Sequence, residues 1–138
     1  MRGFSLVEVI IALVVVSILA SISYPSYVAY VEKSRRAEAV GALLTLATKQ
    51  EKYYQNAGTY TNDMTQLGYS SDPALTPKSV YQIDAVLAAG GQSYTLTATR
   101  HGAQTADTKC GDLVYTSTGV KTALNNSTSD PLKDCWGK

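Results

Sequence analysis

The sequence Met1-Arg-Gly-Phe-Ser-Leu-Val-Glu8 leads directly into residues 9–31, a stretch of 23 residues that contains no Asp, Glu, Lys, Arg or His. About 20 consecutive apolar residues are enough for a helix to span a bilayer. Glu8 is the only charged side chain in the apolar segment that begins at Phe4. Because a carboxylate is costly in lipid, its presence here predicts a function. The stretch therefore predicts a membrane-spanning helix over residues 4–31.

The apolar segment differs from a cleavable secretory signal. Such a signal has an apolar core of about 7–15 residues followed by a small-residue cleavage site. Here the run is longer and continues into helix-forming sequence, which predicts that the segment is retained. Counting Lys33, Arg35 and Arg36 against Arg2 and the amino terminus would keep the C-terminal region in the cytoplasm. Cys110 and Cys135 instead favour a C-terminal region outside the cytoplasm, and we give them more weight.

The two cysteines, Cys110 and Cys135, both lie in the last third of the chain. Their spacing fits no zinc motif, and His101 is the only histidine that could join them as a ligand. A disulfide is the better interpretation, and it places this region outside the cytoplasm. The bond would close a loop of 24 intervening residues, which is worth about 3 kcal/mol in the chain-entropy model.

The segment Gly3-Phe4-Ser5-Leu6-Val7-Glu8 resembles the processing motif of type IV pilins and pseudopilins. Further motifs are similar to the PilE/ComP group of minor pilins, namely Ser34-Arg35-Arg36-Ala37-Glu38-Ala39, Gln50-Glu51-Lys52-Tyr53-Tyr54, Thr59-Tyr60-Thr61, Tyr94-Thr95-Leu96-Thr97-Ala98, Cys110-Gly111 and Cys135-Trp136. The resemblance covers essentially the whole chain. Its N-terminal motif is highly specific for the superfamily, and the later motifs are moderately specific for the subgroup.

The resemblance implies that the chain is first held in the inner membrane and is later part of an extracellular pilus. A prepilin peptidase would cut after Gly3, methylate Phe4 and remove residues 1–3 as a leader. Residues 4–31 would hold the chain in the inner membrane by a single span and later enter the core of an extracellular pilus. Glu8 would guide assembly with other pilin subunits and the inner-membrane assembly machinery, and Pro25 would kink the helix. Residues 32–138 would form the globular domain outside the cytoplasm.

Glu8 also has a purely structural interpretation. Ser5 and Glu8 satisfy the capping-box pattern, and an acidic group near a helix N-terminus contributes up to about 1 kcal/mol. That gain is smaller than the roughly 2.5–3.5 kcal/mol cost of a carboxylate at the bilayer centre. We therefore favour an assembly role, in which the Phe4 amine of a neighbouring subunit neutralises Glu8.

Periodicity predicts an α+β fold in which one long helix packs on a small antiparallel sheet. The helix runs from Phe4 to about Ala57 and ends at Gly58. Beyond residue 32 its apolar stripe is expected at Ala37, Val40, Leu44, Ala47 and Tyr54, broadened by Leu43 and Leu46. The loop that follows is expected to be anchored by Tyr60, Met64, Leu67 and Tyr69. Alternating residues predict strands over 81–87, 94–99 and 112–117, with a weaker fourth segment after Gly119.

Charge and motif content limit the remaining functions. Twelve Lys and Arg side chains oppose eleven Asp and Glu, which does not predict a strongly cationic nucleic-acid surface. Arg100, Lys109 and Lys121 are the candidates for contact with DNA if folding brings them together, whereas Lys33, Arg35 and Arg36 are expected on a solvated helix face. No motif indicates a catalytic residue, a cofactor or a metal. A structural pilin subunit, specifically a minor pilin, is the leading hypothesis. The alternatives are a DNA-binding receptor pilin for DNA uptake and a pseudopilin of a type II secretion system.

Overall fold

The structure is a computed structural model that describes residues 5–137. Its elements are α1 (Leu6–Ala57), β1 (Ala74–Leu75), β2 (Tyr81–Leu87), β3 (Tyr94–Arg100), the 3-10 helix η1 (Gly102–Ala106), β4 (Asp112–Thr116), β5 (Lys121–Leu124) and α2 (Pro131–Cys135). Internal contacts divide the chain between Glu32 and Lys33 into two compact units. The α+β class predicted from periodicity is confirmed.

The first unit is helical and exposes apolar side chains all around its axis. An 18-residue window in α1 has a mean hydropathy of 2.7, and none of that window is buried. The hydroxyls of Ser17 and Ser21 donate to the carbonyls of Val14 and Ile18, at 2.8 and 2.7 Å, so these polar groups are satisfied within the helix itself. A helix with this surface is stable only where lipid or other apolar surface covers it.

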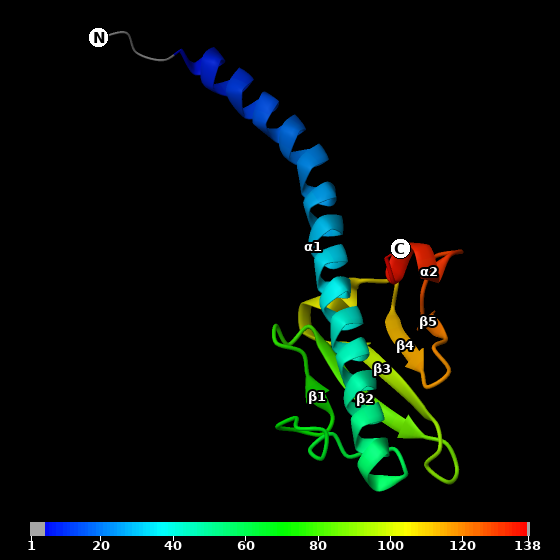
Figure 1. Ribbon diagram of the computed structural model, residues 1–138. Coiled ribbons are helices and arrows are strands. Elements are labelled where there is room, and N and C mark those ends of the chain that lie inside the picture. The colour runs from blue at the N-terminus through cyan, green and yellow to red at the C-terminus, as the bar shows by residue number, and fades with distance from the viewer. Residues whose placement is uncertain (1–4, 138) are drawn as a thin grey trace. The chain divides into compact units, whose positions relative to one another are not determined.

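The second unit is built on a five-stranded antiparallel sheet with the strand order β1-β2-β3-β4-β5. Each strand pairs with the next one along the chain. Short connections join three of these pairs, whereas residues 101–111, which include η1, join β3 to β4. The register places Ile83 opposite Ala98 and Ala98 opposite Leu113, so that a row of apolar residues crosses three strands on one face. Figure 1 shows the C-terminal part of α1 lying across the sheet.

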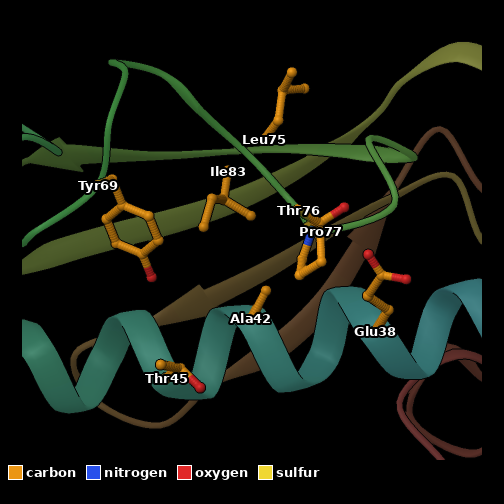
Figure 2. A pocket seen from close by; sticks show the side chains of 8 residues that line it. All are labelled: Glu38, Ala42, Thr45, Tyr69, Leu75, Thr76, Pro77 and Ile83. Carbon is orange, nitrogen blue, oxygen red and sulfur yellow. The ribbon is translucent and has the colours of Figure 1, made fainter.

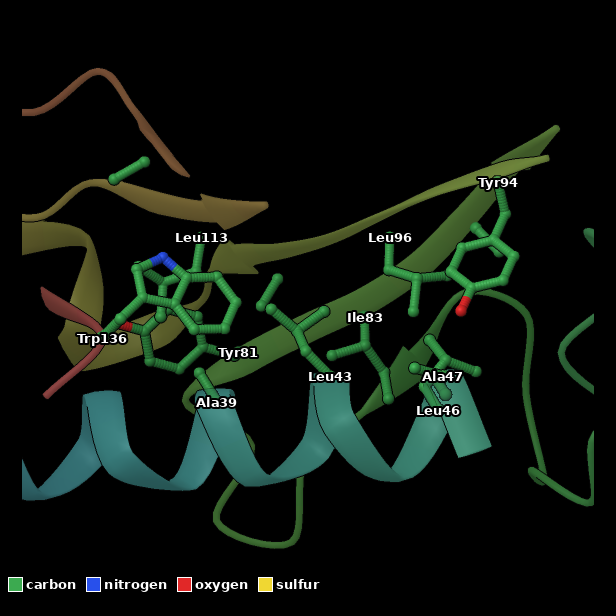
Figure 3. Packing of buried hydrophobic residues seen from close by; sticks show 14 of the residues in the cluster. Ala39, Leu43, Leu46, Ala47, Tyr81, Ile83, Tyr94, Leu96, Leu113 and Trp136 are labelled. Carbon is green, nitrogen blue, oxygen red and sulfur yellow. The ribbon is translucent and has the colours of Figure 1, made fainter. Parts of the chain in front are cut away.

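Strand alternation sets the two faces of the sheet. In β2, Tyr81, Ile83 and Ala85 are buried, whereas Val86 is 62% exposed. In β3, Tyr94, Leu96 and Ala98 are buried between threonines. These strands confirm the predicted alternation. Figure 3 shows the buried side chains of the sheet facing Ala39, Leu43, Leu46 and Ala47 of α1.

The buried face of α1 differs from the predicted stripe. It consists of Arg36, Ala39, Leu43, Leu46, Ala47 and Gln50. Leu44 is 40% exposed and Ala37 is exposed, so the predicted stripe was wrong at both positions. The expectation that Arg36 lies on a solvated face was also wrong. The physical reason is that the polar residues Arg36 and Gln50 belong to the packed face. A stripe drawn only through apolar residues is therefore rotated away from the face that is buried.

The end of α1 and the following loop agree with the sequence analysis. Gly58 adopts φ +73°, and its N–H donates to the carbonyl of Tyr54 at 2.8 Å, which is a typical glycine stop signal. Met64 and Leu67 are buried, and Tyr60 and Tyr69 pack against the core from the rim, so all four predicted anchors of the loop are confirmed. The short elements β1, η1 and α2 were not predicted.

Gly111 is required by a close approach between two strands. It adopts φ +61°, and a Cβ atom at this position would lie 1.9 Å from the carbonyl oxygen of Leu124. Only glycine permits both the backbone conformation and the contact. Gly111 thereby allows the start of β4 to pack against the end of β5, directly after Cys110.

Candidate functional site

The C-terminal region, residues 100–137, is held together by a disulfide between Cys110 and Cys135. The S–S distance is 2.07 Å and the Cα atoms are 5.5 Å apart. Cys110 precedes β4 and Cys135 ends α2, and both are buried in the core. The pairing expected from the sequence is confirmed. It fastens the last helix to the sheet and leaves residues 118–120 and 124–125 exposed.

Trp136 closes the free edge of the sheet next to the disulfide. Its indole Nε1 donates to the carbonyl of Thr122 at 2.9 Å, and its ring lies 6.1 Å from that of Tyr115. The Lys121 ammonium stands 5.6 Å from the centre of the indole. The indole covers this edge carbonyl and occupies it with a hydrogen bond, which makes β5 less open to pairing with another strand there.

A buried ion pair connects α1 to the loop before the disulfide. Arg36 Nε and Nη2 donate to Asp107 Oδ2 and Oδ1 at 2.6 and 2.9 Å, and the two residues are 6% and 1% exposed. Asp107 Oδ1 also accepts from the backbone N–H groups of Lys109 and Cys110, at 3.1 and 3.2 Å. One carboxylate therefore fixes both the helix and the turn that presents Cys110.

The surroundings of Asp107 favour its ionised form. Burial alone would raise its pKa, but hydrogen bonds from Arg36 and from the backbone of Cys110 outweigh that effect and lower the pKa below its ordinary value. Gln104 extends the network by donating to Asp107 Oδ2 at 3.0 Å and to the Tyr81 hydroxyl at 3.1 Å. Burial raises the pKa of Tyr81 to about 12. The network therefore stays in one protonation state at neutral pH.

The N-terminal site is described only in part. Gly3 and Phe4, the predicted processing and methylation residues, lie outside the described residues. The Ser5 carbonyl accepts from the N–H groups of Glu8 and Val9 at 3.0 and 3.3 Å, which makes Ser5 the N-cap residue. Within residues 5–137, neither side-chain hydrogen bond of a capping box joins Ser5 to Glu8, and the exposed Glu8 carboxylate has no partner. Pro25 lies inside α1 without interrupting it, and the expected kink stays a prediction.

Two family models together cover most of the chain. Residues 1–24 match the prokaryotic N-terminal methylation motif. Residues 25–114 match the family described as type IV minor pilin ComP, DNA uptake sequence receptor. The chain belongs to this family of type IV minor pilins.

Individual relatives of this minor pilin are also pilus proteins. The fimbrial protein EcpC of Eikenella corrodens is 31% identical over 71% of this chain and 61% of its own length. The type IV major pilin PilE of Neisseria gonorrhoeae is 29% identical over 59% of this chain and 49% of its own. The type IV major pilin PilA of Myxococcus xanthus is 28% identical over 51% of this chain and 32% of its own length. The minor pilin thus spans less than two thirds of the length of each of these relatives.

The fold agrees with that of a solved pilin. A high-resolution structure of a type IV pilin from Shewanella oneidensis superposes with a TM-score of 0.51 at 25% identity. The superposition covers 72% of the minor pilin and 99% of that chain. The architecture of a long helix on an antiparallel sheet is therefore that of a type IV pilin.

Each of the three basic residues predicted as a DNA contact lies near another group of the same chain. Arg100 Nε lies 3.0 Å from Asp112 Oδ1, and Nη1 donates to the carbonyl of Asp107 at 2.7 Å. Lys109 Nζ lies 3.6 Å from Asp134 Oδ2. Lys121 stands opposite Tyr115, three residues along β4 from Asp112, or about 10 Å at the usual rise of a strand. Arg100 and Lys109 each face an acidic partner, and the Lys121 ammonium lies 5.6 Å from the centre of the Trp136 indole.

The network around Asp107 was missed because its members are polar and far apart in sequence. Asp107 lies 71 residues from Arg36, and sequence spacing alone does not reveal such a pair. A local signal was present, since an Asp two or three residues before backbone N–H groups commonly accepts from them in a turn. In the described part of the chain, no group of three or more His, Cys, Asp or Glu residues could hold a metal ion.

Replacing Asp107 with Asn should destabilise the second unit and change its response to acid. Breaking a buried ion pair costs about 3–5 kcal/mol. Because the folded-state pKa is lowered, the contribution of Asp107 is complete above the ordinary aspartate pKa of about 3.9 and is lost as pH falls through the folded-state pKa. We expect the stability difference between wild type and Asp107→Asn to be largest near neutral pH and to shrink below about pH 4. Denaturant unfolding followed by the fluorescence of Trp136, the single tryptophan, measures the free energy of unfolding of each protein. Repeating it over a pH series gives the response to acid.

The double variant Arg36→Met/Asp107→Asn is the matched control. It removes both charges at once, so no unpaired guanidinium stays buried, and the new amide oxygen can still accept from the backbone N–H groups of Lys109 and Cys110. It should therefore recover most of the stability that Asp107→Asn loses. Equal stability of wild type and Asp107→Asn at neutral pH would contradict the assigned importance of the pair.

Proposed function

We propose that this chain is a structural subunit of a type IV pilus, with the place of a minor pilin. The observation that carries the proposal is the exposed apolar part of α1, which has Glu8 as its one carboxylate near the start. Such a helix is insoluble by itself and needs a continuous apolar environment. Both a bilayer and a bundle of identical helices provide one, so the same helix serves storage in the membrane and assembly in the filament.

The proposal divides the chain into three parts. Residues 1–3 are the leader, residues 4–31 are the membrane and filament helix, and residues 32–138 are the globular domain outside the cytoplasm. The subunit is held in the inner membrane and then moves into the extracellular pilus. Its partners are the prepilin peptidase, the inner-membrane assembly machinery and other pilin subunits. The role is structural rather than catalytic.

Glu8 sets the axial register of assembly in this proposal. Cleavage after Gly3 creates a free amine at Phe4, and a neighbouring subunit's Glu8 is its counter-charge in an apolar core. An ion pair with one defined geometry fixes how far adjacent helices are staggered, because any other stagger leaves a buried charge without a partner. Within residues 5–137 the Glu8 carboxylate makes no capping-box bond to the backbone N–H of Ser5, which favours this role over a local one.

The processing step predicts a specific mass. Purified filaments should contain a chain that starts at Phe4 and carries one N-methyl group, because the Gly3-Phe4 motif is the substrate of the peptidase. Intact-mass spectrometry measures this directly. A chain from filaments that still carries Met1 and Arg2 would remove the basis for the assignment.

Changing Glu8 to Ala should lower incorporation into filaments by about tenfold or more, which corresponds to losing at least about 1.4 kcal/mol per subunit contact. Membrane insertion should persist, because the span becomes more apolar. Immunoblots of sheared filaments and of the membrane fraction give the two quantities.

Ser5→Ala is the matched control for this experiment. It removes the N-cap hydroxyl and leaves the Glu8 charge in place. If Glu8 acts in assembly, only Glu8→Ala should reduce incorporation. Equal effects of the two substitutions would make Glu8 a capping residue.

DNA capture is the second candidate function, favoured by the match of residues 25–114 to a family described as a DNA uptake sequence receptor. The charges argue against a strong phosphate contact. Arg100 and Lys109 each lie near an acidic residue of the same chain, so DNA phosphates would have to compete with these partners. Cations that are paired in this way are less available to phosphates, and clustered free cations carry non-specific affinity.

We therefore expect weak binding of the full chain, in detergent micelles, to duplex DNA at physiological salt. Fluorescence anisotropy across a salt series gives the affinity and the number of phosphates contacted. The variants are the triple Arg100→Gln/Lys109→Gln/Lys121→Gln and the double Lys109→Gln/Lys121→Gln, which spares the Arg100–Asp112 pair. Sub-micromolar affinity that falls steeply with salt and is lost in both variants would make DNA capture the primary function.

A further inference from the structure

A pocket of about 280 Å³ lies between α1, β2, and β1 with the loops on either side of it. Its walls are Glu38, Ala42, Thr45, Tyr69, Leu75, Thr76, Pro77 and Ile83. All of them belong to the second unit. Figure 2 shows Glu38 at one end and Tyr69 at the other, with Ala42 between them on the helix. The pocket is therefore apolar along its length and acidic at one end.

The walls of the pocket are fixed before any ligand arrives. Thr76 N–H donates to the Tyr81 carbonyl at 2.9 Å, and Ser79 N–H donates to the Thr76 carbonyl at 2.8 Å. Tyr69 is held by Lys49, whose ammonium lies 4.0 Å from the ring centre. Preformed walls reduce the ordering cost of binding. The volume lies near the lower limit of about 300–1,000 Å³ for small-molecule sites, so the ligand must be small.

Glu38 supplies a carboxylate oxygen that lacks a hydrogen bond. Its Oε1 accepts from the backbone N–H of Lys78 at 2.9 Å. Its Oε2 is buried without a hydrogen-bond partner, and the nearest ammonium, that of Lys78, is 3.9 Å away. The Lys78 side chain is 67% exposed, whereas that of Glu38 is 14% exposed. A buried anionic oxygen without a donor is costly, and a closer cation relieves that cost.

We propose that this pocket binds a small primary amine, with the ammonium at Glu38 Oε2 and an unbranched apolar stem along Ala42, Ile83 and Tyr69. The ligand's ammonium takes the place of the loosely held Lys78 ammonium, which swings out into solvent. Charge complementarity at Glu38 selects the cationic head, and the apolar walls select the stem. A metal ion does not fit the site, because no cluster of three acidic or histidine ligands occurs within residues 5–137. The site does not depend on the proposed pilus function.

The probe is n-pentylammonium chloride, and the reporter is the Cδ1 methyl group of Ile83. Ile83 lines the pocket, and the other four isoleucines, Ile10, Ile11, Ile18 and Ile22, all lie in the apolar helix. Methyl NMR of the full chain in neutral detergent micelles therefore separates binding in the pocket from partition into the micelle. We expect a saturable shift of Ile83 with a dissociation constant in the millimolar range, and no saturable shift of the other four methyls.

Three comparisons test the charge contact. Glu38→Gln keeps the acceptor for the Lys78 N–H and should weaken pentylammonium binding about tenfold, as the loss of a charge-assisted hydrogen bond implies. The uncharged isostere 1-pentanol should bind the wild type about tenfold more weakly than pentylammonium. Lys78→Gln removes the competing ammonium and should tighten binding several-fold. Lys133→Gln, on α2 and outside the pocket, makes the same change of charge and should leave binding unaltered.

Several results would overturn the assignment. They are an Ile83 shift that only follows the other four methyls, equal affinity of wild type and Glu38→Gln, equal affinity for pentylammonium and 1-pentanol, and weaker binding by Lys78→Gln. If Glu38→Gln disturbs the methyl spectrum of the free protein, the comparison of the two ligands on wild type and the Lys78→Gln titration still decide.

Discussion

The Arg36–Asp107 ion pair is the contact on which the second unit depends, because it joins its most distant parts. The Asp107 carboxylate binds the Arg36 guanidinium. The same carboxylate accepts hydrogen bonds from the backbone N–H groups of Lys109 and Cys110, which shape the turn before β4. The disulfide then links Cys110, in this turn, to Cys135 at the end of α2, next to Trp136. Helix, turn, sheet edge and C-terminus are therefore connected in one chain of contacts. Burying two charges is expensive, and here the cost is offset because both carboxylate oxygens and the guanidinium are hydrogen-bonded.

The apolar part of α1 imposes a different constraint, because it gains nothing from the chain's own core. Its side chains from Leu6 to Glu32 are almost all exposed, whereas the core cluster begins at Ala39. Stability of the second unit and solubility of the first are thus separate problems, solved by separate segments. The second unit uses a disulfide, a buried ion pair and aromatic packing such as the Tyr60–Tyr94 edge contact at 4.7 Å. The first unit requires surroundings that the chain itself does not contain.

Sequence patterns predicted the parts of the fold that repeat locally. The long helix, its end at Gly58, the β2–β3 hairpin and β4 each follow from a period of apolar residues or from a glycine, and the cysteine pair follows from composition. Patterns failed where a polar residue takes a core position. Arg36 and Gln50 are buried because Asp107 and the backbone of Thr61 satisfy them, and these partners are 71 and 11 residues away. Short elements such as β1 and α2 were missed because their two and five residues carry no measurable period. The amphipathic stripe was rotated for the same reason that Arg36 was misplaced.

The charge arrangement bears on what this family member can recognise. Of the three cations that the sequence offered to DNA, Arg100 and Lys109 lie near Asp112 and Asp134, and Lys121 lies against the Trp136 ring. Each contact lowers the gain from binding a phosphate, because the cation must first leave its own partner. Glu38 shows the opposite situation, since an anionic oxygen is buried while its nearest cation remains too far away for a hydrogen bond. Incomplete pairing, rather than the number of charges, marks where a surface still gains free energy from a ligand. By that criterion the acidic pocket on α1 is better prepared for a cation than the C-terminal region is for a phosphate.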